Sequence, residues 1–384
     1  MKVKKAAFFF LVSVAVVGIS VFCSYGTAMS ADNVIRIGVV GPESGGSAQL
    51  GQGQHQAAQM AVDEINSGNL AGDWKLEIFF EDDEGNPTKS ANATNKLIQQ
   101  DKVHVLIGAI NSSATLADMV ITGRAGIPQI TAGSTGSTIT EQGNRWIFRT
   151  AVNDEFQADA LIKYAKEDLG FKKIATLTAA DDYGQSGANL LAGAAEREGL
   201  EVVSAQTYNN GDKDFKPQIL SIKDAGAEGV FLWGLYTEAA LIVRQARQLD
   251  LNAQFFGASG MAAQKLIELG GDAIQGLVLT QSFLPASDKA VVTKFVNGYV
   301  ERFKDTPIPH GAQAYDTIYI IADAVKRAGS TDAEKFREAL ASTSGLQLVT
   351  GEPKFNEKGD DTGKYILLTT IEGDGFKLFK TIEN

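Results

Sequence analysis

The stretch Val103–Thr140, VHVLIGAINSSATLADMVITGRAGIPQITAGSTGSTIT, decides the fold class of this chain. Its pattern predicts a buried strand over 103–107 and then a loop of small polar residues over 108–113. A short helix follows, and a second apolar strand over 127–131 ends in another small-residue loop over 132–137. Apolar runs bounded by Gly and Pro are typical of parallel strands covered on both faces. The stretch is therefore one strand–helix–strand unit of an α/β protein.

The two loops of this unit contain the first candidate site residues. A right-handed crossover places the loops after both strands at the same carboxyl edge of the sheet. In the first loop, Asn111 and Ser112 come just before a helix, and in the second loop Gly133 is followed by Ser134 and Thr135. Unpaired N–H groups and the helix dipole attract anions to a helix N-terminus. We therefore expect a small carboxylate to bind here.

Each of these residues also has a plainer interpretation. Ser112 by itself could only cap its helix, and Gly133 by itself could only form a turn. Their occurrence together in one crossover unit favours a binding site.

The N-terminal residues have the features of an export signal. Lys2, Lys4 and Lys5 form a basic head, an apolar core spans 6–22, and small residues before Asp32 offer cleavage sites. The core is near the lower limit for a membrane span, so an uncleaved anchor is the alternative. The only cysteine, Cys23, follows the bulky Phe22, which disfavours lipid attachment. We expect residues 1–31 to be removed and the mature protein to be periplasmic, without cysteine chemistry.

Length and charge limit the functions that the mature chain can have. About 350 residues exceed what one compact core usually holds, so we expect two lobes. A hydrophobic content of 44% with 21% charged residues is ordinary for a globular protein. Removing the three signal lysines, with no acid, changes the formal charge from −11 to −14. A chain this acidic is not expected to bind nucleic acid or anionic lipid.

Two other loops resemble known ligand sites but lack their essential residues. The strand Val34–Val40 leads into GPESGG, which is neither GxGxxG nor a P-loop, so a nucleotide site is disfavoured. The acidic turn over 81–87 lacks the glycine spacing and terminal glutamate of a calcium loop, and we expect a solvated turn.

Catalysis and metal binding also find no support in the sequence. We expect His55 and His310 in loops and His104 in a strand, too far apart for a metal site or a catalytic triad. No residue stands out as an activated nucleophile or as half of an acid–base pair. We therefore expect neither an enzyme nor a protein with a cofactor.

A series of motifs resembles, in order and spacing, the branched-chain amino-acid binding proteins of bacterial ABC importers. The motifs are VIRIGVVGPESG, EDDEGNP, GAINSSATLADM, IPQITAGST, FRTAVNDEFQ, TLTAADDYGQSGA, FFGASGM and AYDTIYIIADAVKRAG. The resemblance covers the whole mature chain. It implies the type I periplasmic binding fold, with two doubly wound lobes and a ligand cleft between them.

The resemblance also implies lobe boundaries and roles for individual residues. One lobe would comprise 32–153 with 283–365 and the other 154–282 with 366–384, joined by crossovers near residues 153, 282 and 365. Ser112, Gly133 and Thr135 would hold the ligand carboxylate. Asp154 would reach an amino group, and Tyr183 and Tyr236 would close over the side chain. From the residues alone, Tyr183 could instead be a surface packing residue, and Tyr236 is expected in the loop after its strand.

Some positions depart from the family pattern. Ser259 stands where well-known relatives carry a glutamate that balances the ligand ammonium, and a serine supplies only a neutral hydrogen bond. Leu50 replaces a tyrosine of some relatives, and Gly85 and Asn111 replace the cysteines of the family's disulfide. Either Asp154 balances the ligand ammonium in place of that glutamate, or the ligand has no α-amino group.

The expected function is that of a monomeric receptor that traps a small carboxylate ligand between its lobes. The ligand would be an amino acid of the branched-chain type, and the closed form would dock on membrane permease subunits of an ABC importer. The alternatives are an amine-free aromatic or aliphatic acid or amide as ligand, and a ligand-sensing module.

Overall fold

The computed structural model describes residues 33–383, which alternate between strands and helices and form two sheets. The expected export signal and Cys23 lie outside these described residues. Among residues 33–383, no helix is both long enough and apolar enough to cross a lipid bilayer.

The first sheet is parallel and has the strand order β2-β1-β3-β4-β5. Its strands are β1 (Val34–Gly41), β2 (Lys75–Asp82), β3 (Val105–Ile107), β4 (Gln129–Thr131) and β5 (Ile147–Arg149). The intervening helices are α1 (Ala48–Ser67), α2 (Pro87–Gln99), α3 (Ser112–Ala125) and the short α4 (Thr138–Glu141). The strands predicted at 103–107 and 127–131 are therefore present but begin two residues later than expected.

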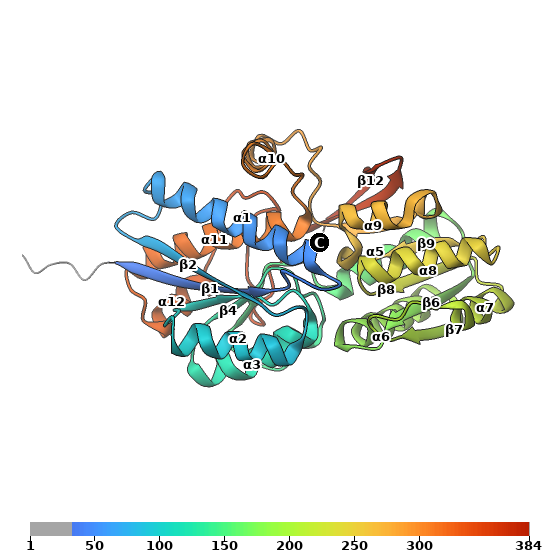
Figure 1. Ribbon diagram of the computed structural model, residues 1–384, viewed down its shortest axis with the longest axis horizontal. Coiled ribbons are helices and arrows are strands. Elements are labelled where there is room, and N and C mark those ends of the chain that lie inside the picture. Colours follow the sequence, from blue (N-terminus) through green and yellow to red (C-terminus); the bar gives the residue numbers. More distant parts are fainter. Residues whose placement is uncertain (1–32, 384) are drawn as a thin grey trace, which may run out of the picture. The chain divides into compact units, whose positions relative to one another are not determined.

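Helices cover both faces of this sheet, as its continuously apolar strands require. On one face, α1 packs against the later helices α10 (Ala290–Phe303) and α11 (Pro309–Ala328), and α12 (Ala333–Ala341) packs against α11, in one apolar core. On the other face, α2 packs beside α3 (Figure 1). We refer to this sheet and these helices as the first lobe.

The second sheet has the order β12-β11-β10-β9-β8-β6-β7, with β11 and β12 antiparallel to their neighbours. Its strands are β6 (Lys173–Ala179), β7 (Glu201–Tyr208), β8 (Gly229–Trp233), β9 (Gln254–Gly257), β10 (Val278–Gln281), β11 (Tyr365–Glu372) and β12 (Gly375–Glu383). Its helices are α5 (Asp154–Lys163), which continues into a π-helical turn, α6 (Asp182–Glu198), α7 (Lys216–Ala225), α8 (Tyr236–Gln248) and α9 (Gln264–Gly270). These elements form the second lobe. The chain passes between the sheets three times: after β5, after β10 and before β11.

Three residues that were expected in loops lie in helices, so those expectations were wrong. His55 lies inside α1, which begins at Ala48. Glycines in its first turns weakened the helical pattern, yet Gly51 fits because a Cβ there would lie 2.0 Å from the Pro42 carbonyl oxygen.

The other two residues lie at helix starts. His310 lies in the first turn of α11, where Pro309 occupies a position that proline favours, and Tyr236 is the first residue of α8. His104, expected in a strand, immediately precedes β3, and its Nδ1 accepts a hydrogen bond from the Arg36 amide at 3.0 Å.

Candidate ligand-binding site

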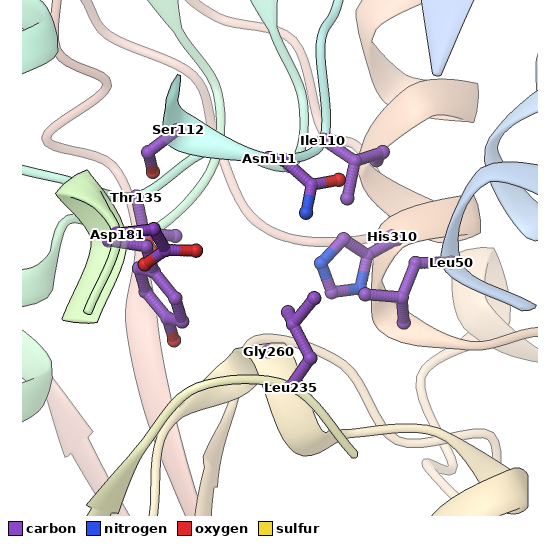
Figure 2. A pocket seen from close by; sticks show the side chains of 11 residues that line it. Leu50, Ile110, Asn111, Ser112, Thr135, Asp181, Leu235, Gly260 and His310 are labelled. Atoms are coloured by element: carbon purple, nitrogen blue, oxygen red, sulfur yellow. The ribbon is translucent and has the colours of Figure 1, made fainter. Parts of the chain in front are cut away.

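A small cavity of about 20 Å³, within about 350 Å³ of space that includes open solvent, lies where carboxyl ends of strands from both sheets meet (Figure 2). The residues that line it are Leu50, Ile110, Asn111, Ser112, Gly133, Thr135, Asp181, Tyr183, Leu235, Gly260 and His310. Of the nine ligand-binding candidates predicted from the sequence, the structure brings five to this cavity: Asn111, Ser112, Gly133, Thr135 and Tyr183.

The N-terminus of α3 provides hydrogen-bond donors at one end of the cavity. Asn111 occupies the N-cap position, but its side chain makes no capping hydrogen bond. Within the described part of the chain, the Ser112 and Ser113 amides have no acceptor. The Ser112 hydroxyl accepts a long hydrogen bond of 3.4 Å from the Gly136 amide and keeps its own proton to donate. Such a group of donors suits an anion such as a carboxylate.

The loop after β4 supplies the opposite wall of this end. Gly133 is tightly packed, because an added Cβ would lie 2.5 Å from Ile110 Cδ1 and 3.2 Å from Ile110 Cα. Its amide donates to the Thr131 hydroxyl at 3.4 Å, so it is partly occupied by the protein. The Thr135 amide has no acceptor among residues 33–383. Of the two amides expected to face a carboxylate, that of Thr135 is the freer one.

Arg149, at the end of β5, fixes this loop from behind. Its Nη1 donates to the Thr135 and Gly136 carbonyl oxygens, both at 2.7 Å. Its Nε donates to the Asp360 carboxylate at 2.7 Å, and its Nη2 donates to the Thr140 hydroxyl at 3.0 Å. The guanidinium is buried, and its planar fork holds two successive carbonyl groups in one orientation. Sequence reasoning missed Arg149, although it lies in the FRTAVNDEFQ motif.

Asp154 begins α5 and is completely buried behind the Thr135 loop, without lining the cavity. Its amide donates to the Thr135 carbonyl oxygen at 3.0 Å. Burial raises the pKa of its carboxyl to about 7, although the nearby Thr135, Trp233 and Ser186 side chains and Arg149 lower it. No described residue makes a hydrogen bond of good geometry with its Oδ2. The carboxyl therefore retains an open hydrogen-bonding position next to the cavity.

Tyr183 lines the cavity from the second lobe and is only 7% exposed, which excludes the surface packing interpretation. Its ring lies 6.1 Å from that of Trp233, and its hydroxyl has no hydrogen-bond partner within residues 33–383. A Cβ on Gly260 would lie 3.0 Å from this hydroxyl, so Gly260 leaves the ring room.

Three more of the predicted ligand-binding residues do not line the cavity. The Ser134 hydroxyl donates into the first lobe, to carbonyl oxygens of the preceding loop at 2.9 and 3.1 Å, because the turn directs Thr135 outward instead. The Tyr236 hydroxyl accepts from the Gln49 amide at 3.2 Å and so joins the two lobes. The buried Ser259 does not line the cavity, and its amide donates to Gln157 Oε1 at 2.9 Å.

Sequence reasoning did not identify several lining residues. Asp181 caps α6 by accepting from the Gly184 amide at 2.9 Å, and its second oxygen accepts from Asn210 at 2.8 Å. Its position after β6, at the carboxyl edge of the sheet, was the signal that could have identified it. Ile110 and Leu235 also follow strands, whereas His310 had no such local signal.

Further hydrogen bonds connect the rims of the two lobes around the cavity. The Thr237 hydroxyl donates to the Gly46 carbonyl oxygen at 2.7 Å, and Gln49 Oε1 accepts from the Lys265 amide at 2.8 Å. On another side, the Ser186 hydroxyl accepts from the Ser137 amide at 3.2 Å. The lobes are therefore closed on each other in this structure.

The structure also bears on the expected absence of metal and disulfide chemistry. Among residues 33–383, no group of three or more His, Cys, Asp and Glu side chains is placed to hold a metal ion. Gly85 and Asn111 are neighbours, since a Cβ on Gly85 would lie 3.2 Å from Asn111 Oδ1. Two cysteines at these positions would therefore lie near each other, but this chain has neither.

The chain is similar to known proteins over nearly its whole described length. Residues 34–375 match the family described as "Periplasmic binding protein". The leucine-, isoleucine-, valine-, threonine- and alanine-binding protein of Pseudomonas aeruginosa is 32% identical over 348 residues, covering 90% of this chain and 91% of that protein.

Two solved structures are similar over nearly their whole length. The leucine binding protein LivK of Thermotoga maritima has a TM-score of 0.86 and 30% identity, covering 91% of this chain and 99% of its own. The branched-chain amino acid transporter substrate binding protein LivJ of Streptococcus pneumoniae, in complex with isoleucine, has a TM-score of 0.83 and 26% identity, with the same coverage.

Proposed function

The chain belongs to the periplasmic binding protein family, and on this premise we propose that its cavity binds a small α-amino acid for delivery to an ABC importer. As a member of this family, the protein is a solute-binding protein and not an enzyme. The family assignment and the type I periplasmic binding fold expected from the sequence are thereby confirmed.

The observation that carries the proposal is the group of open donors at one end of the cavity. The Ser112 and Ser113 amides, the Ser112 hydroxyl and the Thr135 amide have no strong acceptor in the described chain. Among residues 33–383, no arginine or lysine lines the cavity. A ligand carboxylate would therefore be held by aligned N–H groups and one hydroxyl, which bind an anion without burying a second charge.

The groups next to this end suit an ammonium. The Gly133 carbonyl oxygen has no donor within residues 33–383, and the Asp154 carboxyl has one open oxygen behind Thr135. An ammonium would favour the ionised form of Asp154 and lower its raised pKa. The leucine-, isoleucine-, valine-, threonine- and alanine-binding relative supports a small amino acid, and one of the branched-chain type would place its side chain against Leu50, Ile110 and Leu235.

A second candidate ligand is an amine-free carboxylic acid or amide. Two observations favour it: Asp154 does not line the cavity, and Ser259 is uncharged at the position where well-known relatives carry a glutamate. Burial also favours the uncharged form of Asp154, which would not attract an ammonium.

We further propose that closure around the ligand produces the form that docks on the permease subunits. Ligand favours closure to the extent that it binds the closed form more tightly. A monomer would suffice for this task, and cleavage near Ala28, Ser30 or Ala31 would release it into the periplasm. A ligand-sensing role would use the same closed form with a signalling partner.

A thermal-shift screen tests the ligand class. The protein, stripped of ligand by unfolding and refolding, is heated with leucine, isoleucine and valine and with the matching amine-free acids. A ligand at 100 times its dissociation constant adds about 2.7 kcal/mol to the unfolding free energy. A raised midpoint with amino acids alone supports the main proposal, and one with amine-free acids alone supports the second. If neither set raises the midpoint, neither a branched-chain amino acid nor its amine-free analogue is the ligand.

A further inference from the structure

The side chains around the cavity form a polar end and an apolar end. Ser112, Thr135 and Asp181 lie on one side, whereas Leu50 and Ile110 lie on the other (Figure 2). A ligand whose carboxylate binds at Ser112 therefore extends its tail toward the apolar end. The imidazole of His310 lies at that end, and the Asn111 amide lies between Ser112 and Ile110 (Figure 2).

His310 is buried and closely packed but makes no hydrogen bond to the described protein. The residue is 3% exposed and lies in the first turn of α11. Its Cδ2 would lie 3.2 Å from a Cβ on Gly133, so the ring packs closely against the loop after β4. Its Nδ1 is enclosed and has no partner among residues 33–383. The other ring nitrogen points toward the middle of the cavity (Figure 2).

The surroundings of the ring decide which nitrogen carries the proton. Burial lowers the pKa of His310 to about 4, so the imidazole is neutral at pH 7 and carries one N–H. A buried N–H without an acceptor is rarer in proteins than a buried acceptor without a donor. The proton therefore belongs on Nε2, which makes the imidazole a hydrogen-bond donor to the cavity.

We propose that His310 selects ligands whose tail carries a neutral oxygen acceptor, such as a side-chain hydroxyl or carboxamide, over aliphatic ligands of the same shape. This inference rests on the proposed function, since it takes the carboxylate at Ser112 as its reference point. An aliphatic tail removes the Nε2 donor from water without offering it an acceptor. A site that leaves a buried polar group unpaired in this way rejects the apolar analogue.

Isosteric ligand pairs test the proposal on the wild-type protein by calorimetry. Threonine and valine have the same shape, as do asparagine and leucine, and only the first member of each pair carries a tail oxygen. Succinamate and 4-methylpentanoate form the corresponding amine-free pair. We expect the oxygen-bearing member to bind at least about tenfold more tightly in the pair with the highest affinity. Equal or tighter binding of the aliphatic member in that pair overturns the inference and leaves the proposed function intact.

Variants then show whether the imidazole causes the preference. His310→Phe should abolish or reverse it, because a phenyl ring has no donor. His310→Gln should retain part of it, because the amide can donate. His55→Phe is the matched control: His55 is also buried in a helix of the first lobe, packs on Phe80 and does not line the cavity.

The remaining outcomes are also decisive. An unchanged preference in folded His310→Phe, verified by circular dichroism, overturns the role of His310. If that variant does not fold, the affinity ratio of each ligand pair in the wild type and in His310→Gln still tests the role of His310. If none of the six ligands binds, the proposed function and this inference are both overturned. If ligands bind but the aliphatic member is preferred, only this inference is overturned.

Discussion

Replacing Arg149 with methionine should destabilise the fold and weaken ligand binding together. The substitution keeps an apolar stem but removes the charged donor from the buried Asp360 carboxylate and one donor each from the Thr135 and Gly136 carbonyl groups. Removing one partner of a buried ion pair costs about 3–5 kcal/mol, because the other charge stays buried. We expect a loss of that size in the unfolding free energy. Affinity should also fall, since the loop that carries Thr135 loses its support.

Urea denaturation followed by circular dichroism measures this loss, and Arg145→Met is its matched control. Arg145 also makes a two-contact ion pair, with Glu334 at 2.6 and 3.2 Å, but both side chains are about half exposed. Exposed pairs contribute only about 0.2–1 kcal/mol. If Arg149→Met lowers the stability no more than Arg145→Met does, the buried guanidinium does not support the loop.

A double-mutant cycle with Asp360→Asn isolates the pair itself. The second substitution removes the orphaned charge, so the double variant should lose less stability than the sum of the two single losses. Strict additivity would mean that the 2.7 Å contact between Nε and the carboxylate carries no coupling.

The other predictions concern the ligand end and a buried acid. Ser112→Ala should weaken carboxylate binding by about 1–3 kcal/mol, and unchanged affinity in calorimetry would place the ligand elsewhere. Asp154→Asn should weaken the binding only of ligands that carry an amine, and equally weakened binding of amine-free acids would make Asp154 structural. At pH 6, binding of an amine ligand to the wild type should release protons, because the ligand ammonium lowers the raised pKa of Asp154. Asp118 is buried on α3 and accepts from the Ser90 hydroxyl at 2.7 Å. Burial raises the pKa of its carboxyl from 3.8 to about 7, so the protonated form stabilises the fold at low pH. As pH rises from 3.8 through 7, this contribution of about 4 kcal/mol to the unfolding free energy is lost. Asp118→Asn should remove this decline, and identical pH profiles of the two unfolding midpoints would contradict it.

The sequence by itself determined the fold class and predicted two loops that the folded chain brings to one cavity. Both depend on local information: apolar runs of strand length, helix starts, and the rule that loops after parallel strands share one edge. Ser112 and Thr135 could be predicted for this reason. The departure at Ser259 was also visible in the sequence, and it raised the question of the ligand amine before any geometry was known.

Only the tertiary structure decided which side chains reach the cavity and how they are charged. Ser134 and Thr135 are adjacent in sequence, yet one hydroxyl is used inside the lobe and the other residue lines the cavity. Arg149 and Asp360 meet across 211 residues, and His310 packs against Gly133 from a helix that begins far along the chain. Burial and hydrogen-bond partners arise from such distant packing, and they set the pKa values and open donors on which specificity depends. Local sequence patterns contain no information on that packing, which is why Asp154 behind its loop and the unpaired imidazole of His310 emerged only from the folded chain.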